Sequence, residues 1–298
     1  MSKTLIVVTG ATASGKTSLA IDLAEHLGCD VISADSRQIY RDIPIGTAAP
    51  TREELARVRH HFIATLPLDS YYSAACYEQD ALKVVDSQFA RGDYAVVCGG
   101  SMMYVDALTD GIDELPTISP EVRERVKSLY NEHGLDGLNA LLEIVDPEYY
   151  TIVDRANTKR VAHAIEISLQ SGSPYSTLRR GRRTERPFRI IKVAIDMPRP
   201  LLFDRISHRV EQMIASGLEA EARSVYSLRH LNALNTVGYK EMFAYFDGIM
   251  DFDTAVARIA KNTRVYAKKQ LTWLARPSVR PTVFLPTASP LEALLKMI

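Results

Sequence analysis

Residues 10–17 read Gly-Ala-Thr-Ala-Ser-Gly-Lys-Thr and match the phosphate-binding loop pattern G-x-x-x-x-G-K-[ST] at every fixed position. A short apolar run, Leu5–Val8, precedes the loop, and Ser18–Ala24 follows it with the pattern of a helix. In such a loop the backbone amides and the helix N-terminus point partial positive charge at phosphate oxygens. This order predicts an α/β fold that binds ATP or another di- or triphosphate.

Each residue type in this loop has a physical role. Glycines let the backbone wrap closely around phosphate oxygens, Lys16 can reach the outer phosphate, and the Thr17 hydroxyl can ligate Mg²⁺. We therefore expect Mg²⁺ as a cofactor, with Thr17 as its protein ligand. The predicted diphosphate-binding residues are Gly10, Ala11, Thr12, Ala13, Ser14, Gly15, Lys16 and Thr17.

The rest of the chain predicts a sheet with an insertion. Apolar runs at 30–34, 94–98, 189–195 and 282–285 are expected strands, and helices between them predict a P-loop NTPase-like parallel sheet covered by helices. Between residues 113 and 185 we expect only helices, at 120–134, 137–145 and 158–170. A long helix from Pro200, broken at Gly217, and two or three more helices should follow. The predicted organisation is a core of residues 1–112 and 186–298 with an inserted all-helical domain, residues 113–185.

Composition excludes several classes of protein. No run approaches the eighteen or more apolar residues of a membrane span, and a strand begins within a few residues of Met1, which leaves no room for a secretory signal. The cysteines, Cys29, Cys76 and Cys98, are three and widely spaced, which favours reduced thiols in a cytoplasmic protein. The pair His60-His61 is better suited to packing or hydrogen bonding than to a metal site.

Charge is balanced overall but unevenly distributed. The chain has 36 basic and 36 acidic residues, yet Ala255–Arg280 holds seven Lys or Arg and no acid. Such clusters are typical of a face that meets a nucleic-acid backbone, and equally of a solvated helix face. The first cluster contains the helical stripe Arg258, Lys261, Arg264 and Lys268; the second consists of Arg179, Arg180, Arg182, Arg183, Arg186, Arg189 and Lys192.

The position of the nearest acid favours group transfer over nucleotide hydrolysis. A hydrolase of this class needs an acid after an apolar strand to organise Mg²⁺ and water, but the strand at 94–98 is followed by Gly99-Gly100-Ser101. The acid instead follows the second strand, as Asp35, where it would face an acceptor as a general base. Alternatively, Asp35 caps the following turn. A small-molecule kinase and another phosphate-dependent transferase both remain open at this point.

Several further blocks resemble the tRNA dimethylallyltransferase family. The first two are Asp35–Tyr40, similar to D-S-x-Q-x-Y, and Ile45–Ala48, similar to I-G-T-A. The other blocks are His60–Ile63, Tyr72–Ala74, Gly99–Ser101, Ser216–Glu221, Val237–Glu241 and Thr263–Trp273. They span most of the chain in the family's order, and together they are highly specific.

The resemblance implies transfer of a dimethylallyl group from dimethylallyl diphosphate to N6 of the adenine 3′ of a tRNA anticodon, position 37. Asp35 matches the family's catalytic acid, expected to take the proton from the adenine amine. Arg209 matches the family's arginine that contacts the diphosphate, and Thr12 matches a loop residue that faces the substrate; both are expected to be catalytic together with Asp35. The helical insertion domain would grip the anticodon stem-loop, and a monomer suffices for one stem-loop. The matching tRNA-contact positions are Asp35, Ser36, Arg37, Gln38, Ser101, Arg123, Lys159, Arg160, Val161, Ala162, His163, Asn235, Thr236, Val237, Gly238, Tyr239 and Lys240.

Two other functions stay open. An adenylate isopentenyltransferase of the cytokinin type shares the chemistry but accepts a free nucleotide, which needs neither the insert nor a basic C-terminal helix. A P-loop RNA-binding protein without activity would need neither Asp35 nor Arg209. Departures from the family pattern at Ala64, Met102, Met103 and His163 bear on tRNA affinity rather than on the chemistry, and indicate a divergent member.

Overall fold

The computed structural model describes residues 3–181, 183–276 and 282–298. The chain divides into two compact units, a larger one of Met1–Thr109 with Arg186–Ile298 and a smaller one of Asp110–Glu185. The smaller unit begins three residues before the expected insertion, because Asp110 accepts a hydrogen bond from Thr184 and so joins the two ends of this unit.

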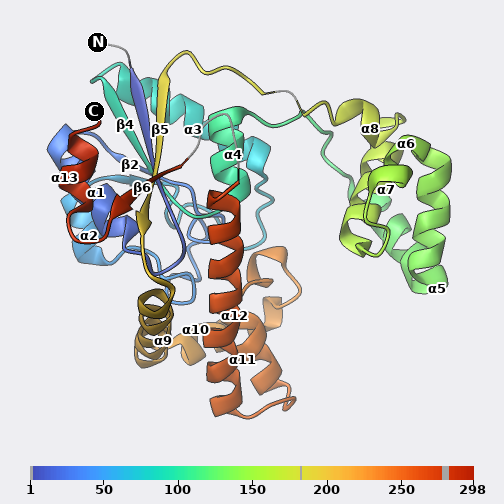
Figure 1. Cartoon of the computed structure of the whole chain (residues 1–298). Helices are drawn as coiled ribbons and strands as arrows, with labels where there is room; N and C mark the ends of the chain where they lie inside the picture. Colours follow the sequence, from blue (N-terminus) through green and yellow to red (C-terminus); the bar gives the residue numbers. More distant parts are fainter. Residues whose placement is uncertain (1–2, 182, 277–281) are drawn as a thin grey trace. The chain divides into compact units, whose positions relative to one another are not determined.

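The larger unit is built on a parallel sheet (Figure 1). In the described residues its strands are ordered β3-β2-β4-β1-β5-β6, and every neighbouring pair is parallel. Four of the strands coincide with the expected apolar runs to within a few residues, and β1 is the run before the phosphate loop. The strands are β1 (Thr4–Thr9), β2 (Val31–Ser33), β3 (His60–His61), β4 (Tyr94–Cys98), β5 (Arg189–Asp196) and β6 (Val283–Pro286).

Helices cover both faces of this sheet. In Figure 1, α1 (Lys16–Leu27) and α13 (Pro290–Leu295) lie on one side, and α3 (Ala74–Phe89) and α4 (Met102–Asp110) on the other. The long helix expected from Pro200 is α9 (Arg199–Ala215). Within the described residues, three α-helices lie between it and β6, in agreement with the expected two or three. The remaining helices of this unit are α2 (Arg52–Arg57), α10 (Leu218–Ser224), α11 (Tyr239–Phe246) and α12 (Phe252–Leu274), with 3₁₀ turns at Tyr226–Leu228 and Asn232–Leu234.

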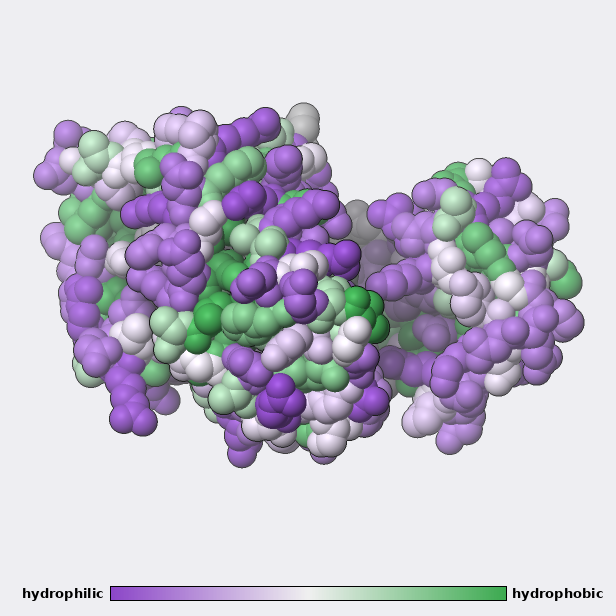
Figure 2. Space-filling view, turned by 90° about the horizontal axis from the view of Figure 1, so that it is seen from below, coloured by the Kyte–Doolittle hydropathy of each residue, from purple (hydrophilic) through white to green (hydrophobic). Residues whose placement is uncertain are grey.

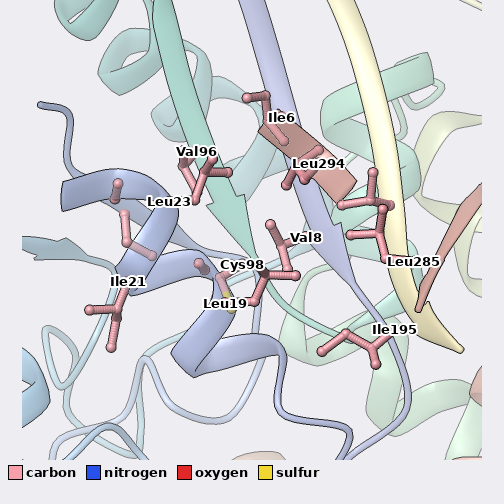
Figure 3. Packing of buried hydrophobic residues seen from close by; sticks show 14 of the residues in the cluster. Ile6, Val8, Leu19, Ile21, Leu23, Val96, Cys98, Ile195, Leu285 and Leu294 are labelled. Carbon is pink, nitrogen blue, oxygen red and sulfur yellow. The ribbon is translucent and has the colours of Figure 1, made fainter. Parts of the chain in front are cut away.

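The main core lies between α1 and the sheet (Figure 3). Ile6 and Val8 of β1 and Val96 of β4 alternate along their strands and pack against Leu19 and Leu23 of α1. All five side chains are buried. This packing holds the start of α1 directly above the carboxyl end of β1, where the phosphate loop lies.

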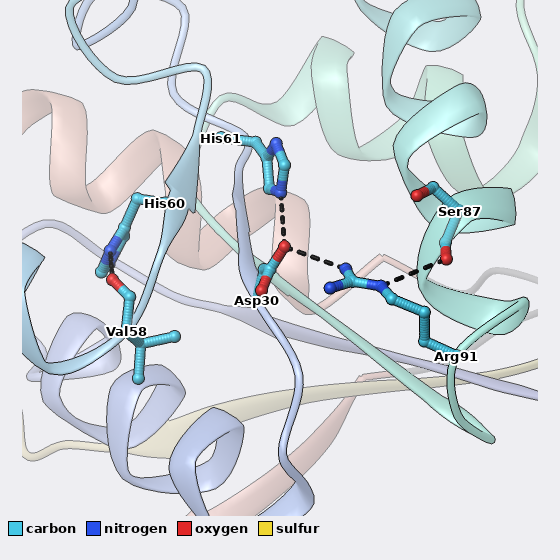
Figure 4. Close-up of polar contacts among 6 residues, drawn as sticks. All are labelled: Asp30, Val58, His60, His61, Ser87 and Arg91. Carbon is cyan, nitrogen blue, oxygen red and sulfur yellow. Dashed lines mark hydrogen bonds and ion pairs between the residues drawn. The ribbon is translucent and has the colours of Figure 1, made fainter.

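The edge strand β3 is held by polar contacts (Figure 4). His61 Nε2 lies 2.8 Å from Asp30 Oδ2, which also accepts from Arg91 at 3.1 Å, while His60 Nδ1 lies 2.8 Å from the Val58 carbonyl. Partial burial alone would raise the pKa of Asp30, but the bonds from His61 and Arg91 outweigh it and lower that pKa. The hydrogen-bonding role expected for the histidine pair is confirmed, and the described residues contain no cluster of three or more metal-ligating side chains.

The smaller unit is entirely helical within its described residues. Asn157 caps α7 at its N-terminus, Gly172 ends it, and Gly134 kinks α5 where we expected two helices. Its core contains Leu138, Leu142 and Ile165. Its helices are α5 (Pro120–Val145), α6 (Pro147–Ile152), α7 (Thr158–Ser171) and α8 (Tyr175–Leu178).

None of the helices in residues 3–181, 183–276 and 282–298 combines the length and the apolar character needed to cross a bilayer. On the face shown in Figure 2, hydrophilic residues predominate, and hydrophobic residues gather in a band across the middle of the larger unit.

Candidate active site

The phosphate loop joins β1 to α1 and has the geometry of an anion site. Gly15 lies at φ 91°, in the left-handed region that only glycine adopts without strain, and this turn brings the amides of α1 toward the loop. No side chain caps the N-terminus of α1. The first-turn amides of a helix have no intrahelical acceptor, so a phosphate oxygen is a natural partner for them here.

Beside the loop lies a cavity of about 410 Å³ within the larger unit. Parallel strands end at a common edge, and this cavity lies at that edge. It brings together segments that are far apart in the sequence. From the loop and the strand ends it is lined by Thr12, Lys16, Thr17, Asp35, Ser36, Arg37, Gln38, Cys98, Gly99 and Ser101; from later segments by Ile206, Arg209, Val210, Met213, Asn235, Thr236, Val237, Lys240, Ile259, Thr263, Tyr266 and Gln270.

Asp35 is both a turn cap and a cavity residue. Its Oδ1 accepts hydrogen bonds from the amides of Arg37 (2.8 Å) and Gln38 (3.2 Å), which is the capping role considered above. Within the described residues, Oδ2 accepts no hydrogen bond. The cap therefore leaves one carboxylate oxygen able to accept a proton from a molecule in the cavity.

Two half-buried cations lie at the loop, Lys16 and Arg209. Arg209 Nη1 donates to Thr12 Oγ1 at 3.1 Å, and Lys16 Nζ lies 3.4 Å from the Ala11 carbonyl. Burial lowers the pKa of Lys16, and the positive charge of Arg209 lowers it further. The negative charge of Asp35 raises that pKa in part. Burial likewise lowers the pKa of Arg209. Two neighbouring cations that are partly removed from water repel each other unless an anion lies between them, so the arrangement favours a bound polyanion.

Cys98 lines the same cavity but is not a nucleophile. Burial raises the pKa of its thiol to about 11, and the nearby Lys16 charge lowers it only in part. Because the thiolate is the reactive form, this thiol stays protonated and inert near neutral pH.

The glycine pair after β4 is explained by close approach. A Cβ on Gly100 would clash with the amide of Gln270. The next residue, Ser101, accepts a hydrogen bond from the Ser36 amide at 2.8 Å and so holds the segment after Asp35. Sequence reasoning assigned Ser101 to tRNA contact; the structure shows that it also orders the turn beside Asp35.

Three residues that the sequence reasoning did not assign complete the site. Glu221 Oε2 and Oε1 accept from the amides of Ile45 (2.8 Å) and Gly46 (2.7 Å), and so hold the segment that borders the cavity. Tyr266 and Gln270 reach the cavity from α12. In the sequence, Thr263, Tyr266 and Gln270 have the spacing of residues on one face of a helix. The basic stripe of the same helix is the more conspicuous pattern and hid it.

Two of the expected tRNA contacts are corrected. Tyr239 is fully buried and donates its hydroxyl to Glu221 Oε1 at 2.5 Å, so it supports the 45–46 segment. Val161 is fully buried in the core of the smaller unit, because it lies on the apolar face of α7. Gly238 is buried as well. Neither the side chain of Tyr239 nor that of Val161 is exposed for contact with tRNA.

The other expected tRNA contacts fall into two groups. In the larger unit Ser36, Arg37, Gln38, Ser101, Asn235, Thr236, Val237 and Lys240 all line the cavity. In the smaller unit Arg123, Lys159, Arg160 and His163 are exposed, and Ala162 is half-buried. The expected tRNA contacts therefore form two sets, cavity residues in the larger unit and mostly exposed residues in the smaller unit.

Only some of the residues in the two basic clusters are exposed in the structure. Arg186 is buried, paired with Glu78, and donates to the carbonyls of Leu108 and Ala107 at the end of α4. Lys192 is also buried. Arg182 and Arg280 lie outside the described residues. Arg264 is half-buried, and the exposed members are Arg179, Arg180, Arg183, Arg189, Arg258, Lys261, Lys268, Lys269 and Arg276.

Comparisons with known proteins show the family of the chain. A family model described as IPP transferase matches residues 38–277. A Porphyromonas gingivalis protein named tRNA dimethylallyltransferase 2 is 54% identical over 275 residues, 92% of each chain. A Phocaeicola vulgatus protein named tRNA dimethylallyltransferase 1 is 51% identical, over 93% of this chain and 92% of the relative.

Two solved structures share the fold. The full-length tRNA isopentenylpyrophosphate transferase of Bacillus halodurans is 30% identical, with a TM-score of 0.69, and the match covers 100% of this chain and 94% of that one. A eukaryotic dimethylallyltransferase described as acting on tRNA reaches a TM-score of 0.84 at 22% identity, over 100% of this chain and 78% of that one, and shows likeness of fold alone.

Proposed function

The chain belongs to the IPP transferase family, and we infer from this membership that it is a transferase that modifies tRNA by dimethylallyl transfer. The observation that carries this proposal is the shared cavity of Asp35, Lys16, Thr17 and Arg209. One edge of that cavity suits a diphosphate, and Asp35 supplies an unpaired carboxylate oxygen. A protein that only hydrolyses a nucleotide has no amine acceptor, and so it needs no base at the position of Asp35.

The donor we propose is dimethylallyl diphosphate, bound at the phosphate loop. Lys16 and Arg209 would neutralise charge on the departing pyrophosphate, while the first-turn amides of α1 bind its oxygens. Thr17 offers a hydroxyl in the same cavity, and the described residues hold no dedicated cluster of metal ligands. This donor set fits Mg²⁺, which takes few protein ligands and keeps phosphate oxygens and water. When bound, Mg²⁺ would supply further charge stabilisation to the leaving group.

The acceptor we propose is N6 of the adenine at position 37 of tRNA, 3′ of the anticodon. The new N6–C bond forms as the C–O bond to the diphosphate breaks, pyrophosphate leaves, and Asp35 Oδ2 takes the amine proton. The base must first leave the stack of the anticodon loop, at a cost of a few kcal/mol. The apolar cavity residues Ile206, Val210 and Met213 suit the dimethylallyl group.

We propose that the smaller unit contacts the anticodon stem-loop. Its exposed cations, Arg123, Lys159 and Arg160, are suited to phosphate oxygens. One copy of the chain provides both units, which is sufficient for one stem-loop. Three free cysteines and a tRNA substrate favour action in the cytoplasm.

The proposed reaction is tested by mass spectrometry of nucleosides. The protein is incubated with dimethylallyl diphosphate and Mg²⁺, either with unmodified tRNA or with AMP. We expect adenosine carrying one dimethylallyl unit from the tRNA reaction alone. Product only from AMP would move the chain to the cytokinin class. Absence of product from both, with tRNA still bound, would support the binding-protein alternative.

Affinity for tRNA is expected to fall as salt rises. Each phosphate contact made by an exposed cation releases counterions, so the logarithm of the binding constant should fall linearly with the logarithm of salt concentration. The slope can be measured by fluorescence anisotropy with a labelled anticodon stem-loop. Replacing exposed Lys159 and Arg160 by glutamine should make the slope shallower. If the tRNA affinity of the unaltered protein does not change with salt concentration, the basic residues do not bind the tRNA backbone.

A further inference from the structure

One face of α12 forms a wall of the candidate active site. Ile259, Thr263, Tyr266 and Gln270 follow one another at intervals of four, three and four residues, and all four line the cavity. Gln270 is the most deeply placed of the polar ones, with 3% of its surface exposed. A buried primary amide requires partners for both its oxygen and its nitrogen.

Gln270 has both partners, and they lie in different segments of the site. Its Oε1 accepts from the amide of Thr12 at 2.9 Å, and its Nε2 donates to the carbonyl of Gly100 at 2.9 Å. One side chain of the last long helix thus joins the phosphate loop after β1 to the turn after β4. Gly100 must lack a side chain for this approach.

The bond to Thr12 bears directly on diphosphate binding. In a phosphate loop, backbone amides serve as phosphate donors, but the Thr12 amide is already committed to Gln270. The Thr12 hydroxyl in turn accepts from Arg209 at 3.1 Å. A continuous chain of hydrogen bonds therefore runs from Gly100 through Gln270 and Thr12 to Arg209.

We propose that Gln270 is a positioning residue for the diphosphate. It fixes the first turn of the phosphate loop and, through Thr12, the guanidinium of Arg209. This inference rests on the proposed function and adds to it a residue outside the phosphate loop. The amide is required because the site needs one acceptor and one donor at fixed places. A carboxylate would keep the acceptor, but it would face the Gly100 carbonyl and bring negative charge toward the diphosphate.

The first test compares Gln270→Glu and Gln270→Met with a matched control, Gln88→Met. Gln88 is also buried, and its side-chain atoms have no hydrogen-bond partner among the described residues. Displacement of catalytic groups by about 1 Å can cost about 10²-fold in rate. We expect both Gln270 variants to lose about 10- to 100-fold in kcat, with tRNA affinity unchanged. The control should keep kcat, which would show that the loss is not a general effect of replacing a buried amide.

A second measurement does not depend on transfer activity. Binding of pyrophosphate with Mg²⁺ is followed by calorimetry for the unaltered protein, Gln270→Glu, Arg209→Gln and the double variant. If Gln270 acts through Thr12 and Arg209, the loss in the double variant will be clearly smaller than the sum of the single losses. Additive losses, or wild-type pyrophosphate binding and kcat in both Gln270 variants, would overturn the proposal. If the unaltered protein binds pyrophosphate but prenylates neither acceptor, the proposed function fails while the role of Gln270 is still decided.

Discussion

Replacing Asp35 by asparagine is expected to lower the rate of prenyl transfer by about 10²–10⁴-fold, the usual contribution of a positioned general base. Asparagine keeps an oxygen that can accept from the amides of Arg37 and Gln38, so the turn after β2 should survive. It lacks the second carboxylate oxygen that we assign to the amine proton. The loss should therefore appear in kcat, with tRNA affinity close to that of the unaltered protein.

The measurement is single-turnover transfer to an anticodon stem-loop, with anisotropy for binding. Asp42→Asn is a suitable control, since Asp42 is exposed and follows the same strand. Asp35→Ala removes both the base and the cap, and should additionally weaken tRNA binding if the turn is part of the acceptor site. An Asp35→Asn variant with full activity would refute the assignment of Asp35 as base.

Replacing Arg209 by glutamine is expected to lower turnover by about 10²–10³-fold, the usual cost of removing one donor to a developing charge. Arg209 is half-buried in the cavity at the loop, where its guanidinium is less screened by water than at the surface. Arg209→Lys keeps the charge without the planar pair of donors and should recover only part of the rate.

The Arg209 effect should also be visible in stability. A ligand that binds only the folded state raises Tm, so pyrophosphate with Mg²⁺ should raise it less in Arg209→Gln than in the unaltered protein. Arg52→Gln, at an exposed position on α2, serves as the control. An equal rise in Tm for all three proteins, with turnover retained, would show that Arg209 does not contact the diphosphate.

Local patterns were sufficient for most of the sheet. β1 is fully buried, β4 is buried except at Tyr94, and the middle of β5 is buried; each was expected within a residue or two. β3 was missed because two residues, His60 and His61, are too short to show alternation. The two 3₁₀ turns after α10 were missed for a related reason, because three residues are too few for helical periodicity to be read.

The sequence by itself determined the phosphate loop, because its eight residues carry their conformation and their chemistry locally. It also determined that Asp35 and the loop would share one edge of a parallel sheet, since that edge follows from strand direction. Only the tertiary structure decided which similar residues are functional. Arg186 and Arg189 look alike in the sequence, yet one is buried against Glu78 and the other is exposed. Gln270 lies 258 residues from the amide it binds, and contacts at such a separation depend on how the whole chain packs.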